Sequence, residues 1–172
     1  MPRAAEARGP RRIVLVGFMG SGKTTVGRLL GRDLRWGFLD MDRCIEERCG
    51  LRIPEIFEQH GEPFFREQEL QVAREAGDLE RHVIAAGGGA FAFDATREAL
   101  RSGAVTVWLW APVEIVLARV RPDGSRPLAG SRERIRRLFA EREPSYRLAD
   151  CHVDATAGPE EVVRRVRQTV GR

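Results

Sequence analysis

An eight-residue segment near the start of the chain has the residue types and spacing of a phosphate-binding loop. Gly17-Phe18-Met19-Gly20-Ser21-Gly22-Lys23-Thr24 fits the pattern G-x-x-x-x-G-K-[ST]. Its glycines allow successive backbone N–H groups to face one anion, and the N-terminus of a following helix adds positive partial charge. We expect this loop to bind ATP through Gly20, Ser21, Gly22, Lys23, Thr24 and Thr25. The alternative is a glycine-rich turn that only caps a helix.

Lys23 has a second argument in its favour. Of the 29 lysine and arginine residues in the chain, it is the only lysine. A compact ammonium fits between the phosphates inside a tight loop, whereas a planar guanidinium does not. We therefore expect Lys23 to be catalytic and to contact the β- and γ-phosphates. A GTPase switch is disfavoured, because its guanine-binding N-K-x-D motif would need a second lysine.

Two carboxylates follow the second apolar run, at Asp40 and Asp42. One of them can support Mg²⁺ through water while Thr24 binds the ion directly, and the other can orient an acceptor hydroxyl and take its proton. The alternative for either carboxylate is an N-cap on the helix that follows.

The segment Gly87-Gly88-Gly89 indicates either close approach of a ligand to the backbone or a flexible turn. Arg66 and Arg142 are candidate anion-binding residues, although an arginine in this chain is more often a solvated surface residue. Arg126 lies in a segment rich in glycine and proline and resembles part of a lid that closes over the γ-phosphate.

Short apolar runs alternate with longer amphipathic segments along the chain. We expect strands at 13–16, 37–40, 83–86, 104–110 and 151–153. We expect helices at 23–34, 41–49, 53–59, 62–77, 94–102, 112–120, 131–143 and 159–170, with Asp94 as an N-cap. This alternation predicts a three-layer α/β/α fold around a central parallel five-stranded sheet. The candidate residues then fall at the carboxyl ends of strands, where such folds bind ligands.

Bulk composition limits the classes of function. With 172 residues, 42% of them hydrophobic, the chain fits one domain with a real core. The net charge of +4 suits an acidic small molecule and is too diffuse to indicate nucleic acid. We expect residues 1–11 to form a flexible tail and no segment to enter a membrane. Three scattered cysteines predict a reduced, cytoplasmic protein, and Cys44, Cys49 and His60 make a poor metal site.

These motifs together resemble the shikimate kinase family from about Ile13 to the C-terminus. The resemblance rests on the phosphate loop and on Leu39-Asp40-Met41-Asp42, Gly61-Glu62 leading to Phe65-Arg66 with Glu69, the triple glycine, Arg126-Pro127-Leu128 and Arg142-x-Pro144-x-Tyr146. It implies a single P-loop kinase domain at 12–172, similar to nucleoside monophosphate kinases, with a mobile lid at about 121–130.

The resemblance also implies roles for individual residues. Asp42 would hold the hydroxyls of shikimate and act as base, with Arg66 and Arg142 on its carboxylate and contacts from Gly87, Gly88 and Gly89. Thr24 would hold one Mg²⁺ per subunit, with Asp40 in its outer shell, and Arg126 would touch ATP as a catalytic residue. Glu69 would position Arg66. Phe91 and Phe93 make the stretch after the triple glycine unusually aromatic, and they can line the acceptor pocket.

The expected reaction is the ATP-dependent phosphorylation of the 3-hydroxyl of shikimate, by a monomer. Three alternatives remain: a gluconokinase-like sugar-acid kinase, a nucleoside monophosphate kinase and a nucleotide-binding paralogue without activity. Asp42 would repel a phosphorylated acceptor, which argues against the second. The third is disfavoured because every expected catalytic position is occupied.

Overall fold

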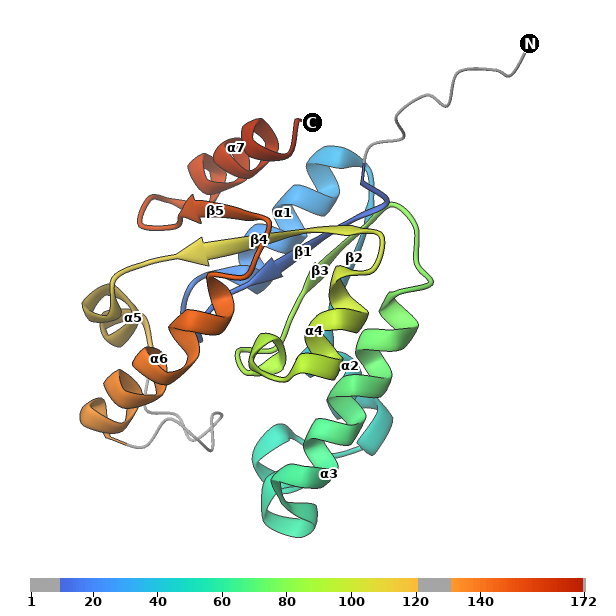
Figure 1. The fold of residues 1–172 in the computed structure, drawn as a ribbon, viewed down its shortest axis with the longest axis vertical. Helices are drawn as coiled ribbons and strands as arrows, with labels where there is room; N and C mark the ends of the chain where they lie inside the picture. Colours follow the sequence, from blue (N-terminus) through green and yellow to red (C-terminus); the bar gives the residue numbers. More distant parts are fainter. Residues whose placement is uncertain (1–9, 121–130, 172) are drawn as a thin grey trace.

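The structure is a computed structural model that describes residues 10–120 and 131–171. Within these residues, one sheet of five parallel strands has the order β2-β3-β1-β4-β5. The strands are β1 (Arg12–Val16), β2 (Gly37–Asp40), β3 (His82–Ala85), β4 (Ala104–Trp110) and β5 (Cys151–Asp154). The predicted parallel sheet is confirmed, and it brings the carboxyl ends of β1, β2 and β3 to one edge (Figure 1).

Strand β1 shows why an uninterrupted apolar run forms the centre of such a sheet. All five of its residues are buried. Successive side chains of a strand point to opposite faces, so both faces of a central strand must be covered. Ile13 and Leu15 pack with α1 (Lys23–Leu34) and α7 (Pro159–Val170). Val14 and Val16 belong to a second core cluster on the other face.

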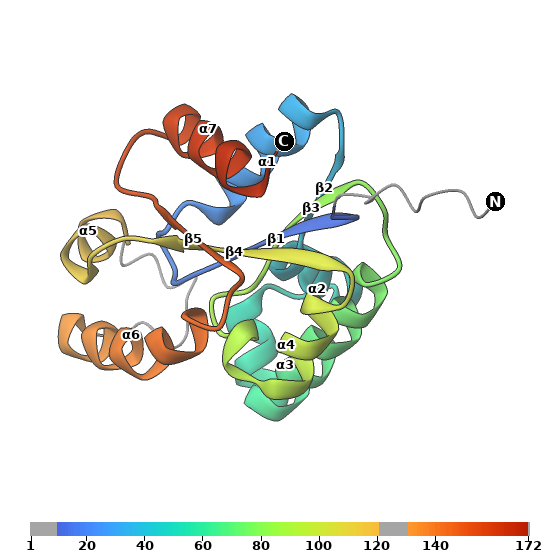
Figure 2. The ribbon, with the colours of Figure 1, turned by 45° about the horizontal axis from the view of Figure 1, so that its top comes forward.

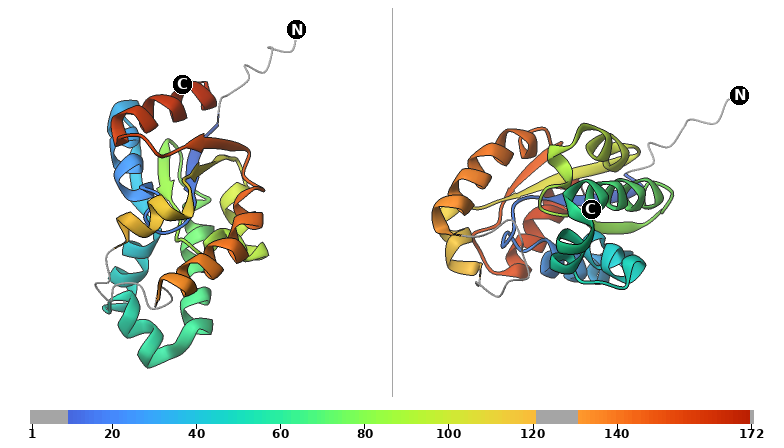
Figure 3. Two further views of the ribbon diagram at one scale, coloured as in Figure 1. Left: turned by 90° about the vertical axis from the view of Figure 1, so that its left-hand side faces the viewer. Right: turned by 90° about the horizontal axis from the view of Figure 1, so that it is seen from below.

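The second face is covered by the remaining helices. These are α2 (Met41–Cys49), α3 (Ile53–Ala76), α4 (Asp94–Arg101), α5 (Val113–Arg119) and α6 (Arg132–Tyr146), with a short 3₁₀ helix, η1 (Ala90–Ala92). Figure 2 shows α1 and α7 on one side of the sheet and α3, α4 and α6 on the other. The left view of Figure 3 again places α7, in red, next to α1, in blue. The predicted three-layer α/β/α architecture is therefore confirmed.

Helix α3 spans the two helices predicted at 53–59 and 62–77. Gly61 interrupts it with φ 81° and ψ 171°, a conformation that an ordinary side chain rarely adopts. Pro63 follows two residues later and suits the first turn of the second half. The two predicted helices are thus present, joined across a kink at Gly61.

The C-terminus of α6 and the N-cap of α4 differ from the prediction. Helix α6 continues through Pro144 to Tyr146 instead of ending at Glu143. A proline costs a helix one hydrogen bond, and here the loss is offset by the complete burial of Tyr146. At α4, Phe93 occupies the N-cap position, and Asp94, the predicted N-cap, is the first helical residue.

Some predictions fall outside the described residues. The predicted lid at 121–130, including Arg126, lies there, as does most of the predicted tail at 1–11. Among the residues that are described, no helix is long and apolar enough to cross a membrane.

Candidate active site

The loop between β1 and α1 has the backbone geometry that its glycines predicted. Gly17, Gly20 and Gly22 all have positive φ, at 144°, 74° and 93°. At Gly17 the need for glycine is also steric, because a Cβ there would lie 2.9 Å from the carbonyl oxygen of Leu109 in β4. The loop therefore folds tightly against the end of the neighbouring strand and opens into the N-terminus of α1.

Lys23 lies inside this loop. Its Nζ donates to the carbonyl oxygens of Gly17, at 2.7 Å, and Phe18, at 2.9 Å, and the residue is 9% exposed. The ammonium group is thus fixed at the centre of the loop. The buried Oγ of Ser21 has no hydrogen-bond partner among the described residues, as expected for a polar group that faces a ligand site.

Asp40 is the N-cap that the sequence offered as one of its two possible roles, and it also contacts Thr24. Its Oδ1 accepts from the backbone N–H groups of Asp42, at 3.1 Å, and Arg43, at 3.4 Å, which makes it the N-cap of α2. Its Oδ2 accepts from the hydroxyl of Thr24 at 2.7 Å. One carboxylate therefore joins the start of α2 to the first turn of α1.

Gly87 separates two carboxylates at the end of β3. A Cβ at this position would lie 2.7 Å from Oε1 of Glu69 and 2.9 Å from Oδ1 of Asp42. Only glycine leaves both oxygens room. Glu69 is 1% exposed, and its Oε1 has no hydrogen-bond partner among the described residues. Burial raises the pKa of Glu69 above its ordinary value, and Arg66 opposes that rise.

Two arginines from distant helices converge on Gly89. A Cβ at this position would lie 2.8 Å from both Nη atoms of Arg66 in α3 and 3.0 Å from Nη2 of Arg142 in α6. Arg66 also donates to Oε1 of Glu62 and, at 2.9 Å, to Oε2 of Glu69. Two guanidinium groups at one point form a site for a carboxylate or a similar anion. We call Asp42, Arg66, Glu69 and Arg142, grouped around Gly87–Gly89, the acceptor cluster.

Gly88 connects the acceptor cluster to the phosphate loop. A Cβ at this glycine would lie 3.6 Å from the backbone nitrogen of Met19 and 3.8 Å from Nη1 of Arg142. The anion-binding arginines and the phosphate loop are therefore separated by little more than the triple-glycine backbone. This arrangement suits the transfer of a group between two ligands that bind side by side.

A family model described as shikimate kinase matches residues 19–171. This chain belongs to the shikimate kinase family. The shikimate kinase of Moorella thermoacetica is 47% identical over 165 residues, which cover 94% of this chain and 95% of that protein. The structure of the Acinetobacter baumannii shikimate kinase in complex with shikimate is 38% identical, with a TM-score of 0.89 over 94% of this chain and 92% of that one.

Family membership settles the class of enzyme among the alternatives. The chain is a kinase, and the expected phosphotransferase class is confirmed. A gluconokinase from Sinorhizobium meliloti has a TM-score of 0.61 at 17% identity, with coverage of 96% of this chain and 94% of that one. That likeness shows the shared fold alone. The sugar-acid alternative therefore has much weaker support than the shikimate kinase family.

The structure also brings in residues that the sequence did not single out. Arg119 of α5 donates to the carbonyl oxygens of Gly20, at 3.4 Å, and Ala155, at 3.1 Å. A pocket of ≈ 370 Å³ opens between the phosphate loop, Arg119 and the segment from Ala155 to Pro159. The sequence showed no basic residue within that segment, and α5 provides one from elsewhere. Nothing distinguishes Arg119 in the sequence from the many other arginines.

Tyr146, named in the sequence only as part of a motif, has a defined task in the structure. Its hydroxyl donates to the carbonyl oxygen of Gly88, and burial raises the pKa of the phenol well above its ordinary value. The hydroxyl therefore stays protonated and can hold the triple-glycine backbone throughout the physiological pH range. The family motif Arg142-x-Pro144-x-Tyr146 contained this residue without indicating its task.

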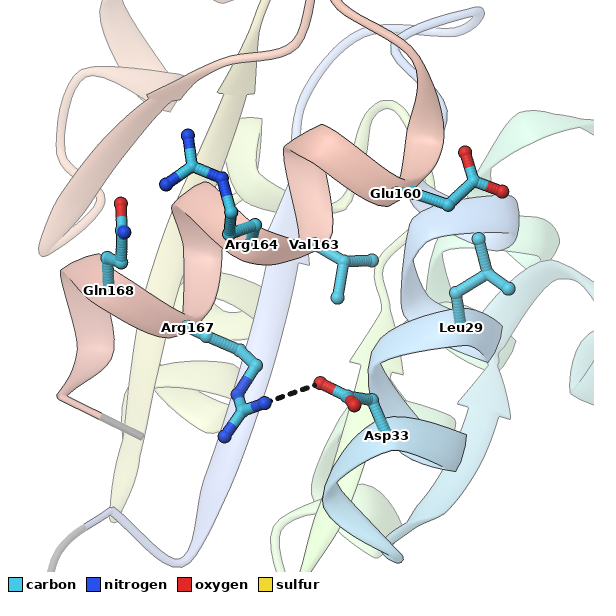
Figure 4. Close-up of a pocket in the computed structure, with 7 residues that line it drawn as sticks. All are labelled: Leu29, Asp33, Glu160, Val163, Arg164, Arg167 and Gln168. Carbon is cyan, nitrogen blue, oxygen red and sulfur yellow. Dashed lines mark hydrogen bonds and ion pairs between the residues drawn. The ribbon is translucent and has the colours of Figure 1, made fainter.

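A second hollow, of ≈ 450 Å³, lies between α1 and α7 (Figure 4). Leu29 and Val163 face each other across it, and Arg167 pairs with Asp33 at 2.9 Å along one side. Both charged groups of that pair are engaged with each other. The hollow shares no residue with the phosphate loop or the acceptor cluster.

Proposed function

We propose that this chain transfers the γ-phosphate of ATP to the 3-hydroxyl of shikimate, giving shikimate 3-phosphate and ADP on the route to chorismate and the aromatic amino acids. One observation carries the proposal. Arg66 and Arg142 meet at Gly89, next to a phosphate loop, in a chain of the shikimate kinase family. A second substrate that carries both a carboxylate and a hydroxyl matches this pair of sites.

The phosphate loop supplies the nucleotide end of the reaction. We assign to Lys23, whose Nζ lies inside this loop, the stabilisation of negative charge on the β- and γ-phosphates as the bond between them breaks. Gly20, Ser21, Gly22, Thr24 and Thr25 supply backbone and hydroxyl groups at the N-terminus of α1. The pocket beside Arg119 and Ala155–Pro159 is the place we assign to the adenine and ribose.

Thr24 and Asp40 fit a Mg²⁺ ion in their donor types. The Thr24 hydroxyl can bind the ion directly, and the Asp40 carboxylate, hydrogen-bonded to that hydroxyl at 2.7 Å, can hold one of its water ligands. In the described residues, no group of three His, Cys, Asp or Glu side chains could hold a metal by itself. A site completed by phosphate oxygens and water is what Mg²⁺ usually occupies, and the ion would neutralise phosphate charge there.

The acceptor cluster supplies the other end. Asp42 is our candidate for the base that orients the 3-hydroxyl and accepts its proton as the oxygen attacks the γ-phosphorus. Arg66 and Arg142 bind the carboxylate of shikimate, and Glu69 fixes the guanidinium of Arg66 through the hydrogen bond at 2.9 Å. Gly87–Gly89 allow the substrate to approach the backbone. Arg126, outside the described residues, stays a predicted ATP contact.

A coupled assay of ADP release with Mg-ATP tests this function directly. Shikimate, gluconate and AMP are compared as acceptors at equal concentration. We expect turnover with shikimate alone. Comparable turnover with gluconate or AMP would replace the acceptor assignment, while tight ATP binding without turnover of any acceptor would indicate a nucleotide-binding paralogue.

We further propose that the enzyme works as a monomer in the cytoplasm. The phosphate loop and the acceptor cluster both come from a single chain, so one subunit holds both substrate sites. Light scattering coupled to size exclusion gives the mass in solution, and a dimer mass would contradict the proposed state. Cell fractionation, with the activity followed in each fraction, tests the compartment.

A further inference from the structure

Phe93 is unusual in two respects, as the N-cap of a helix and as an exposed hydrophobic residue. It occupies the N-cap of α4 with an extended backbone, where residues with a side-chain oxygen are strongly preferred. The side chain of a phenylalanine has no oxygen to accept an N–H group in the first turn of the helix. The residue is also 41% exposed, and with Leu148 it is one of the two large hydrophobic residues that are exposed in the described part of the chain. Neither helix capping nor burial explains a phenylalanine here.

The contact that Phe93 makes is with Arg66. The ring centroid of Phe93 lies 4.5 Å from Cζ of Arg66, closer than the ring of the adjacent Phe65, at 5.1 Å. The contact joins different elements, because α4 lies beside α3 and Phe93 directly follows η1 (Figure 1). Phe91, two residues earlier, is fully buried in the core and belongs to a different environment.

The guanidinium of Arg66 is therefore held in two ways. Within its plane, Nε, Nη1 and Nη2 donate to Glu62 and Glu69. Its Cζ also lies over the ring of Phe93, an arrangement that attracts a cation to the aromatic face. Both Nη atoms of Arg66 lie beside Gly89, where a side chain is absent. Nη2 of Arg142 lies beside the same glycine. An arginine fixed in this way loses little freedom when it binds a carboxylate.

We propose that Phe93 is a positioning residue that sets the affinity of the acceptor site for a carboxylate, by holding the guanidinium of Arg66 in its binding orientation. This proposal rests on the proposed function, because it takes the acceptor carboxylate as the ligand of Arg66. It explains both anomalies: the ring is kept at the N-cap and at the surface because the substrate-binding arginine lies beneath it.

The decisive variant is Phe93→Ser. Serine is a preferred N-cap residue, so this change should leave the melting temperature equal or higher while it removes the ring. We expect the KM for shikimate to rise about two- to fivefold, the range that one partly exposed cation–π contact supplies. The kcat and the KM for ATP should change little. Phe93→Tyr and Phe93→Trp keep an aromatic face and should restore the wild-type KM.

Two comparisons show whether Phe93 acts through Arg66. The first uses the neutral carboxamide of shikimate as acceptor, whose kcat/KM should be the same in the wild type and in Phe93→Ser. The second repeats Phe93→Ser in an Arg66→Lys background, where a compact ammonium has no planar face to cover and the effect on KM should shrink. Leu148→Ser, at the other exposed hydrophobic residue, is the matched control and should change neither KM.

The outcomes separate this proposal from the proposed function. Wild-type turnover of shikimate with an unchanged KM in Phe93→Ser would overturn the role of Phe93 alone. An equal loss for shikimate and its carboxamide would also overturn it, since the ring would then be a general apolar wall. Absence of wild-type turnover with shikimate would overturn the proposed function and this proposal together.

Discussion

The phosphate loop and the acceptor cluster are adjacent, yet they are built from different parts of the molecule. The phosphate loop is a continuous run of eight residues, whose backbone conformation and one lysine form the anion site. The acceptor cluster is assembled from α2, α3 and α6 and the triple glycine after β3, and it relies on charged side chains that hold one another. Gly88 is the point where the two meet.

This difference shows which groups of the protein recognise each kind of ligand. A phosphate can be bound by backbone N–H groups, which every residue carries, so a local turn is sufficient. A carboxylate and specific hydroxyls need fixed side chains, which only a folded set of helices can align. A single substitution in the phosphate loop should therefore abolish most of the activity. Single substitutions in the acceptor cluster should instead weaken the binding of the acceptor by separate, smaller amounts.

The largest effect is expected at Lys23. Lys23→Ala should lower kcat by about 10²- to 10³-fold, because it removes a positive charge from the point where transition-state charge develops. Lys23→Arg keeps the charge but not the compact shape, so it should lose nearly as much. Steady-state kinetics gives the rates, and circular dichroism should show unchanged folds. Near-normal turnover by Lys23→Ala would exclude the phosphate-loop assignment.

Arg142→Ala is expected to act on one substrate. It removes half of the arginine pair at Gly89, so the KM for shikimate should rise by about 10- to 100-fold, the worth of one or two charge-assisted hydrogen bonds. The KM for ATP should change much less. Both constants come from the same coupled assay with each substrate varied in turn. The reverse pattern, with ATP affected more, would show that the carboxylate site is misassigned.

Gly89→Ala tests the convergence of the two arginines without removing either. Its added Cβ would lie 2.8 Å from both Nη atoms of Arg66, so the guanidinium must move from its held position. We expect a rise of roughly tenfold in the KM for shikimate, since a displaced charged hydrogen bond is weakened rather than lost. Gly88→Ala, whose nearest contact would be 3.6 Å, is the neighbouring control and should have the smaller effect. Equal effects of the two changes would contradict the steric argument.

The smallest expected effect is a dependence of the free energy of unfolding on pH, caused by the titration of Glu69 in the acceptor cluster. Burial raises the pKa of Glu69, so the folded protein holds this proton more tightly than the unfolded chain. Its contribution to stability is therefore complete at pH values below the ordinary range of a glutamate. It is lost as the pH rises toward the raised value, with a slope of at most about 1.4 kcal/mol per pH unit.

Glu69→Gln removes this titration while keeping the shape of the side chain. Urea unfolding of both proteins between pH 4 and pH 8 should show the wild type losing stability relative to the variant as the pH rises. Glu67→Gln, at an exposed position of the same helix, controls for the change in net charge. Parallel profiles for the wild type and Glu69→Gln would contradict the prediction.

Most of the fold followed from the sequence because its signals are local. The five strands and the bounds of α1, α2 and α7 agree with the predicted ranges to within a residue. Helix α6 was predicted to end before Pro144, where the burial of Tyr146 and its bond to Gly88 outweigh the cost of the proline. The N-cap of α4 was predicted one residue late, because a capping residue is expected to carry an oxygen and Phe93 does not.

In the site, too, the features that could be predicted are those that depend on neighbouring residues in the sequence. The geometry of the phosphate loop could be predicted from eight consecutive residues. The convergence of Arg66 and Arg142 could be anticipated only through the family resemblance, because the two lie far apart in the chain and resemble many surface arginines. Arg119 was beyond both routes, since its partner, the carbonyl of Ala155, is defined only by the folded chain. Phe93 was noted only as a residue that can line the acceptor pocket, and its contact with the guanidinium of Arg66 needed the folded chain.

The single lysine gives this enzyme an unusual spectroscopic property. Apart from the α-amino group at the chain start, the ammonium of Lys23 is the only primary amine in the molecule. Growth on isotope-labelled lysine would therefore place one reporter nucleus in the protein, inside the phosphate loop. Reductive methylation would mark the same atom and the α-amino group, and the rate at Lys23 would measure how often a residue that is 9% exposed becomes accessible. In a chain with many lysines the signal of the phosphate-loop lysine must be resolved from the others, whereas this chain has no other lysine signal.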